Sequence, residues 1–246
     1  MIKTEKNIIR PIHFVCMGLF IEGGNMNKQN VKKMVMIALF CALSYICVFV
    51  FRIKVSFLTF DAKDAIITIS GFLYGPLSAI ATTVITAVLE FITVSDTGVY
   101  GLVMNVLSSL AFSLPASVLY RYKKSANSAV LGLGLSIAMM TMVMCIANLL
   151  ITPFYMHVDV GVVKSMLPSL ILPFNMTKAL LNSGIILFIY KPFVNALRKI
   201  GMAPKNEKSD YCFNKKTVLL IILSLVLISL AFVIFFMLLD GSFHLI

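Results

Sequence analysis

The chain has 246 residues, of which 60% are hydrophobic and 13% are charged, and its formal net charge is +11. This composition excludes a soluble globular domain and a disordered chain, and it indicates an integral membrane protein. The net positive charge does not indicate nucleic acid binding, because the basic residues lie between apolar runs rather than in one cluster.

The first 25 residues differ from the rest of the chain. Their apolar stretch, residues 11–20, is too short to cross a bilayer and has no small-residue cleavage signal. A start at Met26 would give a conventional chain, and residues 22–25 could be the translation of a purine-rich ribosome-binding site. We interpret residues 1–25 as an amino-terminal extension that a wrongly assigned start codon would explain.

Seven apolar runs predict helices that could cross a hydrocarbon core of roughly 30 Å. The second run looks short and ends at Gly75 and Pro76, where a tight turn would lead directly into the third. The predicted fold class is therefore an all-α, polytopic membrane protein. Its predicted spans are residues 34–51, 64–76, 77–95, 101–120, 128–152, 168–190 and 217–239.

The basic residues predict the orientation of the chain. With the amino terminus in the cytoplasm, most lysines and arginines between the spans lie inside, as the positive-inside rule requires. Residues 203–216 then form a basic cytoplasmic linker, and residues 217–246 form an additional span with a short outer tail. Because this last span has no charge in its apolar run, we expect it to face lipid rather than to line a site. The basic residues that fall outside are Arg52, Lys54, Lys63 and Lys164.

A lysine lies within the sixth predicted span, and two asparagines share its helix face. At about 100° per residue, Asn175, Lys178 and Asn182 fall in one stripe. A charged side chain deep in a bilayer costs at least ~2.5 kcal/mol, so it usually faces protein or a wet cavity. This stripe therefore predicts one wall of a binding pocket.

Three other spans place polar residues at a similar depth, in their outer third. At 1.5 Å of rise per residue, Glu90, Asn105 and Asn148 each lie a few turns from the outer end of their helix. The structural alternative is that such residues only join helices, with about 0.6 kcal/mol per contact. We favour the pocket for Asn148, Asn175 and Lys178. For Glu90 and Asn105 both interpretations stay open, since Glu90 could be the ion-pair partner of Lys178.

The first outer loop, residues 52–64, mixes aromatic residues with charges of both signs. It has the composition of a lid over a flat ligand, with aromatic side chains such as Phe60 above the ligand and with Thr59 and Asp61 as polar contacts. The plain alternative is a solvated connector.

On the first span, Ala38 and Ala42 form a small-xxx-small pair that would let another helix approach closely.

The sequence offers no sign of catalysis. It has no P-loop and no G-x-S-x-G or H-E-x-x-H motif, and its five cysteines and three histidines are dispersed without metal-ligand spacing. We therefore expect neither a metal site, nor a cofactor, nor an enzyme.

Several segments, in the same order, resemble the riboflavin-specific substrate-binding (S) components of energy-coupling factor (ECF) transporters, which are bacterial vitamin importers. The resemblance covers the chain from about Met26 to about Met202. The matching segments are residues 57–64, 71–76, 90–98, 101–108, 148–153, 172–178 and 190–193.

This resemblance implies a six-helix domain, residues 26–202, in the bacterial cell membrane. Such a domain would bind riboflavin from outside and work with a transmembrane coupling subunit and two cytoplasmic ATPases, which hydrolyse the ATP. The pocket would contain Asn148, Asn175 and Lys178 with the loop around residues 59–61, and Ala38 and Ala42 would mark the face for the coupling subunit. The last predicted span is one more than the six of the family.

Three other interpretations remain from the residues alone. The chain could be an S component for a different vitamin, because the scaffold is shared and the pocket selects. It could be a retinal-type photoreceptor, with Lys178 forming the Schiff base. It could also be a membrane-embedded enzyme that uses Glu90 and Lys178 as acid and base.

Overall fold

The computed structural model describes residues 28–94, 97–200 and 215–238. The predicted extension, residues 1–25, and residues 203–214 of the predicted linker lie outside this part. The chain divides into two compact units, Met1–Val35 and Met36–Ile246. In the first unit, the described residues 28–35 are helical.

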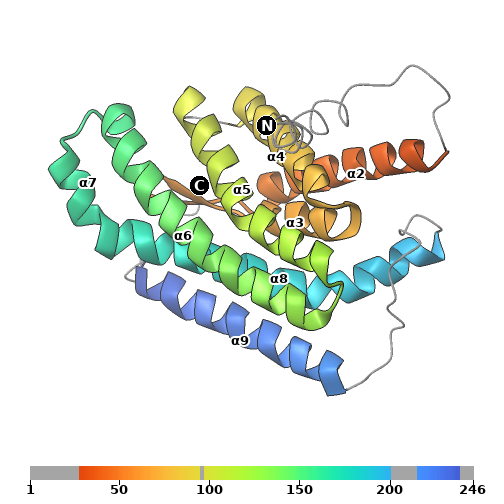
Figure 1. Cartoon of the computed structure of the whole chain (residues 1–246). Coiled ribbons are helices and arrows are strands. Elements are labelled where there is room, and N and C mark those ends of the chain that lie inside the picture. Colours follow the sequence, from red (N-terminus) through yellow and green to blue (C-terminus); the bar gives the residue numbers. More distant parts are fainter. Residues whose placement is uncertain (1–27, 95–96, 201–214, 239–246) are drawn as a thin grey trace, which may run out of the picture. The chain divides into compact units, whose positions relative to one another are not determined.

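Helices make up almost all of the described chain (Figure 1), and six of them are long and apolar enough to cross a membrane. This confirms the prediction of an all-α, polytopic membrane protein. The six are α2 (Lys28–Val50), α4 (Pro76–Thr93), α5 (Gly98–Tyr122), α6 (Ala126–Met156), a continuous helix from α7 (Val160–Met166) through η1 (Leu167–Ile171) to α8 (Leu172–Lys199), and α9 (Lys215–Leu238).

The second apolar run forms a helix, but this helix cannot cross a bilayer by itself. Helix α3 (Lys63–Tyr74) has 12 residues, which gives it a length of about 18 Å against a core of roughly 30 Å. Treating residues 64–76 as a complete span is therefore wrong. Lys63, at the start of α3, nevertheless pairs with Glu90 in the last turn of α4, so the two helices run antiparallel beside each other.

The turn between α3 and α4 is as tight as the sequence predicted. Gly75 has a φ of 94°, its N–H donates to the Gly71 carbonyl at 2.8 Å, and Pro76 is the first residue of α4. A Cβ on Gly75 would lie 2.9 Å from Nη1 of Arg121. The positive φ requires glycine here, whereas the end of the flexible Arg121 side chain could move aside.

The first predicted loop contains a hairpin that the sequence analysis did not predict. Strands β1 (Ile53–Val55) and β2 (Leu58–Phe60) pair antiparallel, with Lys54 opposite Thr59. Ser56, in the turn, has a φ of 57°. At the start of the hairpin, Nη1 of Arg52 donates to the Val94 carbonyl at 2.7 Å, which ties the hairpin to the end of α4.

The helix that carries Lys178 is longer than predicted and is interrupted by a π-helical turn. In η1 the N–H of Leu172 donates to the Leu167 carbonyl, five residues earlier. Pro173 follows directly and has no N–H to donate to the preceding turn. Such π-helical turns occur often at functional sites, and this one lies less than two turns before Lys178.

The last helix, α9, packs against α8 (Figure 1). Ser224 and Ala231 are 0% and 2% exposed, so one face of α9 is covered by protein while its other faces are exposed. At Gly184 of α8, an added Cβ would lie 3.1 Å from the Ser224 carbonyl oxygen. No described residue of α9 lines the cavity of the molecule, and most of its apolar side chains are exposed, as expected for an appended helix that faces lipid.

Candidate functional site

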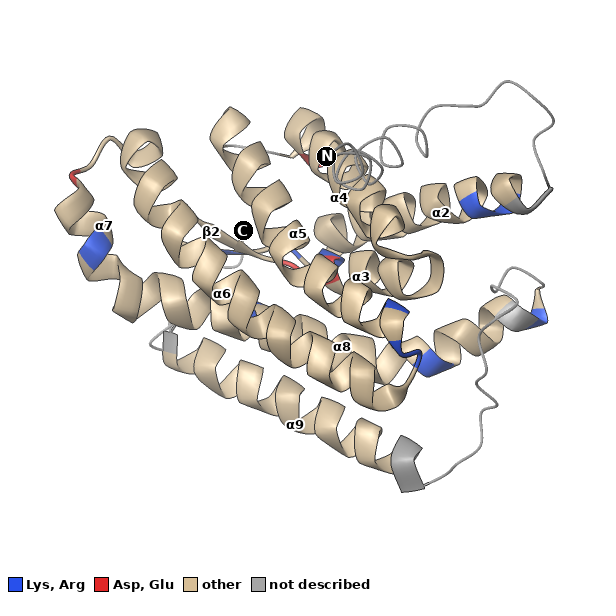
Figure 2. Cartoon of the chain, in the orientation of Figure 1, with Lys and Arg blue, Asp and Glu red and all other residues tan. Residues whose placement is uncertain are grey.

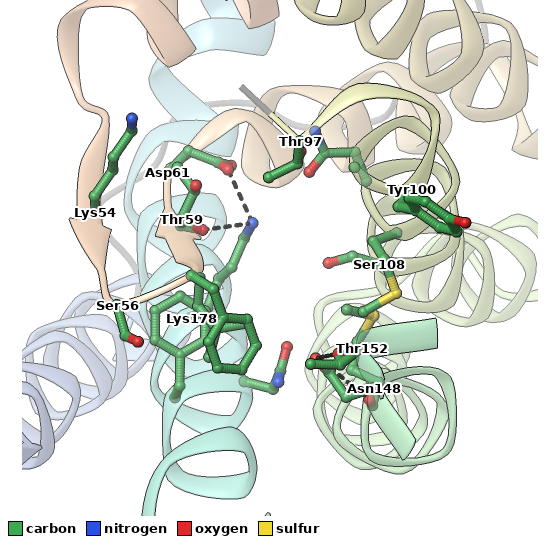
Figure 3. Close-up of a pocket in the computed structure, with 18 of the residues that line it drawn as sticks. Lys54, Ser56, Thr59, Asp61, Thr97, Tyr100, Ser108, Asn148, Thr152 and Lys178 are labelled. Carbon is green, nitrogen blue, oxygen red and sulfur yellow. Dashed lines mark hydrogen bonds and ion pairs between the residues drawn. The ribbon is translucent and has the colours of Figure 1, made fainter. Parts of the chain in front are cut away.

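A partly open cavity of about 180 Å³ is lined by residues of α2, the hairpin, α4, α5, α6 and α8 (Figure 3). This is far more space than the roughly 10–15 Å³ that a single water needs, so the cavity can hold a ligand. Most of the predicted site residues line it. They are Thr59, Asp61, Glu90, Asn105, Asn148, Asn175 and Lys178.

Phe60 is the predicted site residue that the structure places elsewhere. Its neighbours Thr59 and Asp61 line the cavity, but alternation along β2 turns the Phe60 ring to the opposite side. There it packs against Phe174 and Phe235, with ring centroids 6.0 Å and 5.3 Å apart. The expectation that Phe60 covers the ligand is therefore wrong in this structure.

Lys178 is held by the segment that leads from the hairpin into α3. Its Nζ donates to Oδ2 of Asp61 at 2.9 Å and to the Thr59 carbonyl at 3.5 Å, as the dashed lines in Figure 3 show. Both charged groups are buried, with side chains 5% and 2% exposed. The lysine thus joins the second turn of α8 to the end of the hairpin.

Asn182, one turn after Lys178, binds the same segment. Its Nδ2 donates to the Asp61 carbonyl at 3.2 Å, and its Oδ1 accepts from the Ala65 N–H at 2.8 Å. It does not line the cavity as Asn175 and Lys178 do. The stripe of polar residues on α8 therefore has two roles: its first two members face the cavity, and Asn182 fixes the start of α3.

Glu90 does not pair with Lys178, which corrects one of the two open interpretations. Both carboxylate oxygens of Glu90 lie 2.7 Å from Nζ of Lys63, and Nδ2 of Asn105 donates to Oε2 at 2.8 Å. Lys63 begins α3 beside the last turn of α4, whereas Lys178 already has Asp61 as its partner. The sequence analysis placed Lys63 among the outer basic residues, yet it is only 2% exposed.

Acidic and basic residues thus meet in the interior at the start of α3 (Figure 2). Asp61 links the two lysines, since its Oδ2 is 2.9 Å from Nζ of Lys178 and 3.8 Å from Nζ of Lys63. Burial alone would raise the pKa of Asp61, but the two ammonium groups outweigh burial and hold this pKa below its ordinary value. Asp61 is therefore ionised.

Asp64 is the least satisfied member of this cluster. Its Oδ1 accepts from the Ser109 hydroxyl, but its Oδ2 is buried without a hydrogen bond and lies 3.9 Å from Nζ of Lys178. The two lysines face three carboxylates, those of Asp61, Asp64 and Glu90. Both ammonium groups are therefore neutralised by protein, and a ligand need not supply a negative charge.

Two buried amides, one on α6 and one on α8, also line the cavity. Nδ2 of Asn148 donates to the Met144 carbonyl at 2.7 Å, and its Oδ1 accepts from the Thr152 hydroxyl at 3.0 Å. Nδ2 of Asn175 donates to the Ile171 carbonyl at 2.8 Å. An amide group has two N–H donors and an oxygen with two lone pairs. Each amide therefore keeps donor and acceptor capacity for a ligand.

Aromatic and sulfur-containing side chains complete the walls. Phe57 belongs to the loop whose aromatic residues were expected to cover the ligand, whereas those on the helices were not predicted. Phe57 and Phe174 line the cavity beside Lys178, and the rings of Tyr100 and Tyr155 lie 6.4 Å apart on other helices. The helical period gave a usable signal, because Met144, Asn148, Ile151 and Tyr155 share one face of α6. Flat apolar walls with a few convergent polar groups are typical of sites for small molecules.

Ala38 and Ala42 do not take part in the cavity. Both are exposed on α2, on a helix face that also exposes Ile46 and Phe49, at 55% and 67%. This face is open to a partner or to lipid, and its assignment to a coupling subunit stays a prediction.

Among the described residues, no group of three or more His, Cys, Asp or Glu is placed to hold a metal ion.

Comparison with known proteins gives consistent matches. Residues 32–194 match the family described as the substrate-specific component of ECF transporters. The riboflavin transporter FmnP of Bacillus subtilis (strain 168) is 31% identical over 185 residues, which cover 69% of this chain and 97% of that protein. The riboflavin transporter RibU of Staphylococcus aureus (strain TCH60) is 27% identical over 185 residues, which cover 71% of this chain and 97% of that protein. A solved S component of a bacterial ECF transporter is 25% identical, with a TM-score of 0.59, and the match covers 68% of this chain and 98% of that one.

Proposed function

We propose that this chain, which belongs to the family of substrate-specific components of ECF transporters, binds riboflavin and delivers it across the bacterial cell membrane. The observation that carries this proposal is the likeness to two riboflavin transporters along nearly their whole length. In this proposal riboflavin is the transported substrate, and the chain uses no cofactor.

The chemistry of the cavity suits this substrate. Riboflavin has a flat ring system, which can pack between apolar walls such as those of Phe57 and Phe174. Its pyrimidine edge has carbonyl acceptors and one N–H donor, and the amides of Asn148 and Asn175 can serve both kinds. Because Lys63 and Lys178 are neutralised by buried carboxylates, the cavity suits a neutral ligand.

Transport would need partners that supply energy. In our proposal residues 26–202 form the substrate-binding domain, and the face with Ala38 and Ala42 contacts a transmembrane coupling subunit. Two cytoplasmic ATPases bound to that subunit hydrolyse ATP, so this chain is not itself an enzyme. The amino terminus lies in the cytoplasm, as the distribution of Lys and Arg supports, and the cavity then opens to the outside.

The absorption spectrum of the protein tests this proposal directly. The full chain, purified in detergent from cells supplied with riboflavin, should carry a yellow flavin absorption band and quench flavin fluorescence on titration. Other vitamins added in excess should not displace the flavin. A protein that neither co-purifies with flavin nor binds it would contradict the proposal, and tight binding of another vitamin would identify an S component with a different substrate.

A further inference from the structure

Helix α9 lies beyond the part of the chain that matches the family, which ends at residue 194. The helix is nevertheless fitted to the domain. Its buried residues Ser224, Ala231 and Phe235 follow one face at helical spacing, and Gly184 of α8 leaves room for that face. An added Cβ at Gly184 would lie 2.6 Å from Cγ1 of Ile228. The close packing of α9 on α8 therefore depends on the absence of a side chain at Gly184. The other faces of α9 are exposed.

The C-terminal end of α9 contacts the face of the hairpin that carries Phe60. Phe235 is 6% exposed, and its ring centroid lies 5.3 Å from that of Phe60 in β2. Phe60 in turn meets the edge of Phe174 of α8 at 6.0 Å. Together with Val55 and Leu58, these rings form a small apolar cluster, separate from the main core. We call these five residues the hairpin cluster.

A two-stranded hairpin is at best marginally stable alone. Packing in the hairpin cluster therefore stabilises this hairpin in its position beside the cavity. One side of the hairpin lines the cavity with Lys54, Ser56 and Thr59, as Figure 3 shows. The other side packs into the hairpin cluster, where Phe235 packs against the ring of Phe60. Leu58 and Phe174 belong to this cluster and also line the cavity. Loss of Phe235 would expose that ring and loosen the wall that the hairpin gives to the cavity.

We propose that α9, through Phe235, is a positioning element that holds the hairpin over the cavity and slows the exchange of the bound ligand. The identity of that ligand rests on the proposed function, whereas the positioning of the hairpin does not. Phe235 does not line the cavity; it acts through Phe60.

The test compares Phe235→Ala with Phe232→Ala in the full chain in lipid nanodiscs. Phe232 is on the same helix but 50% exposed, so it serves as the matched control. Stopped-flow flavin fluorescence should show riboflavin leaving the Phe235→Ala protein about two- to tenfold faster, the range expected for one lost aromatic pair. Phe232→Ala should release riboflavin at the rate of the unsubstituted protein. Phe235→Leu should release it at a rate between those of Phe235→Ala and the unsubstituted protein.

A second measurement does not need riboflavin. Hydrogen exchange of the backbone amides of residues 53–60 in the ligand-free protein should quicken in Phe235→Ala and stay unchanged in Phe232→Ala. Local loosening of the hairpin with little change in the melting temperature supports the proposal. Unchanged exchange of the hairpin amides overturns it, and so does equal quickening throughout α3, α4 and α8, which would mean a general structural role.

The outcomes separate this proposal from the proposed function. If the unsubstituted protein binds no riboflavin, the proposed function fails, and hairpin exchange alone decides the role of Phe235. If riboflavin binds but dissociates from Phe235→Ala and Phe232→Ala at the same rate, the proposed function stands and the positioning role of Phe235 fails. If Phe235→Ala does not fold, Phe235→Leu provides the same two measurements.

Discussion

Asp61, at the end of the hairpin, and Lys178, in the second turn of α8, form a buried ion pair with 2.9 Å between Oδ2 and Nζ. The two residues are 117 positions apart in the sequence. Their pairing joins the hairpin to the helix that carries the polar stripe. It therefore fixes the polar side of the cavity.

Replacing Asp61 should damage this arrangement more than replacing Asp64. Asp61→Asn keeps the shape but removes the charge nearest to Lys178, and breaking a buried ion pair typically costs about 3–5 kcal/mol. Asp64→Asn removes a carboxylate whose Oδ2 has no hydrogen bond, so we expect a change in the free energy of unfolding of less than about 1 kcal/mol. Thermal unfolding of the purified variants in detergent measures the difference. Equal loss in both variants would contradict this account of the cluster.

Removing the Asn148 amide should weaken riboflavin binding. Asn148→Ala deletes a buried polar group with spare donor and acceptor capacity, and it leaves the Thr152 hydroxyl without its acceptor. We expect the dissociation constant to rise about tenfold or more, because an unpaired buried polar group costs about 1–3 kcal/mol. Lys178→Ala should weaken binding by a similar factor.

The control for the Asn148 experiment lies on the same helix. Thr141→Val removes a hydroxyl that donates to the Ile137 carbonyl at 2.8 Å and does not line the cavity. Fluorescence titration should give this variant the affinity of the unsubstituted protein. Undiminished affinity in both Asn148→Ala and Lys178→Ala would refute the proposed pocket.

Enlarging Ala42 should separate binding from assembly. Ala42 is exposed on α2 and does not line the cavity, so Ala42→Leu should leave riboflavin affinity unchanged. If this face meets the coupling subunit, the larger side chain blocks close helix approach, and co-purification with that subunit should fall at least tenfold. Ile46→Leu, which keeps the size of a neighbouring exposed side chain, should assemble normally. Normal assembly of Ala42→Leu would move the interface elsewhere.

The turn between α3 and α4 should depend on its glycine. Gly75→Ala places a Cβ on a backbone with a φ of 94° and a ψ of 169°, a conformation that essentially only glycine adopts, so we expect a loss of about 1–3 kcal/mol in the free energy of unfolding. Gly134 in α6 has nothing within 4 Å of an added Cβ, and Gly134→Ala should instead stabilise by about 0.5–1 kcal/mol. Melting temperatures of the two variants should thus move in opposite directions. A loss in Gly134→Ala as large as that in Gly75→Ala would contradict this account of the two glycines.

Local sequence determined much of the fold. The apolar runs predicted the long helices, because a bilayer requires about twenty apolar residues per crossing. Gly75 and Pro76 predicted the turn because their backbone preferences are local. The polar stripe of α8 was also visible, since a charge within an apolar helix is costly wherever that helix lies.

The tertiary structure alone decided which charges pair and which side chains face the cavity. Lys63 appeared as one more loop lysine, but the packing of α3 against α4 buries it against Glu90 and leaves Lys178 to Asp61. Phe60 faces Phe235 rather than the ligand, because β2 alternates its side chains and α9 supplies a distant partner. Pairings of this kind depend on contacts between residues far apart in the chain, and the helical period of one segment carries no information about them.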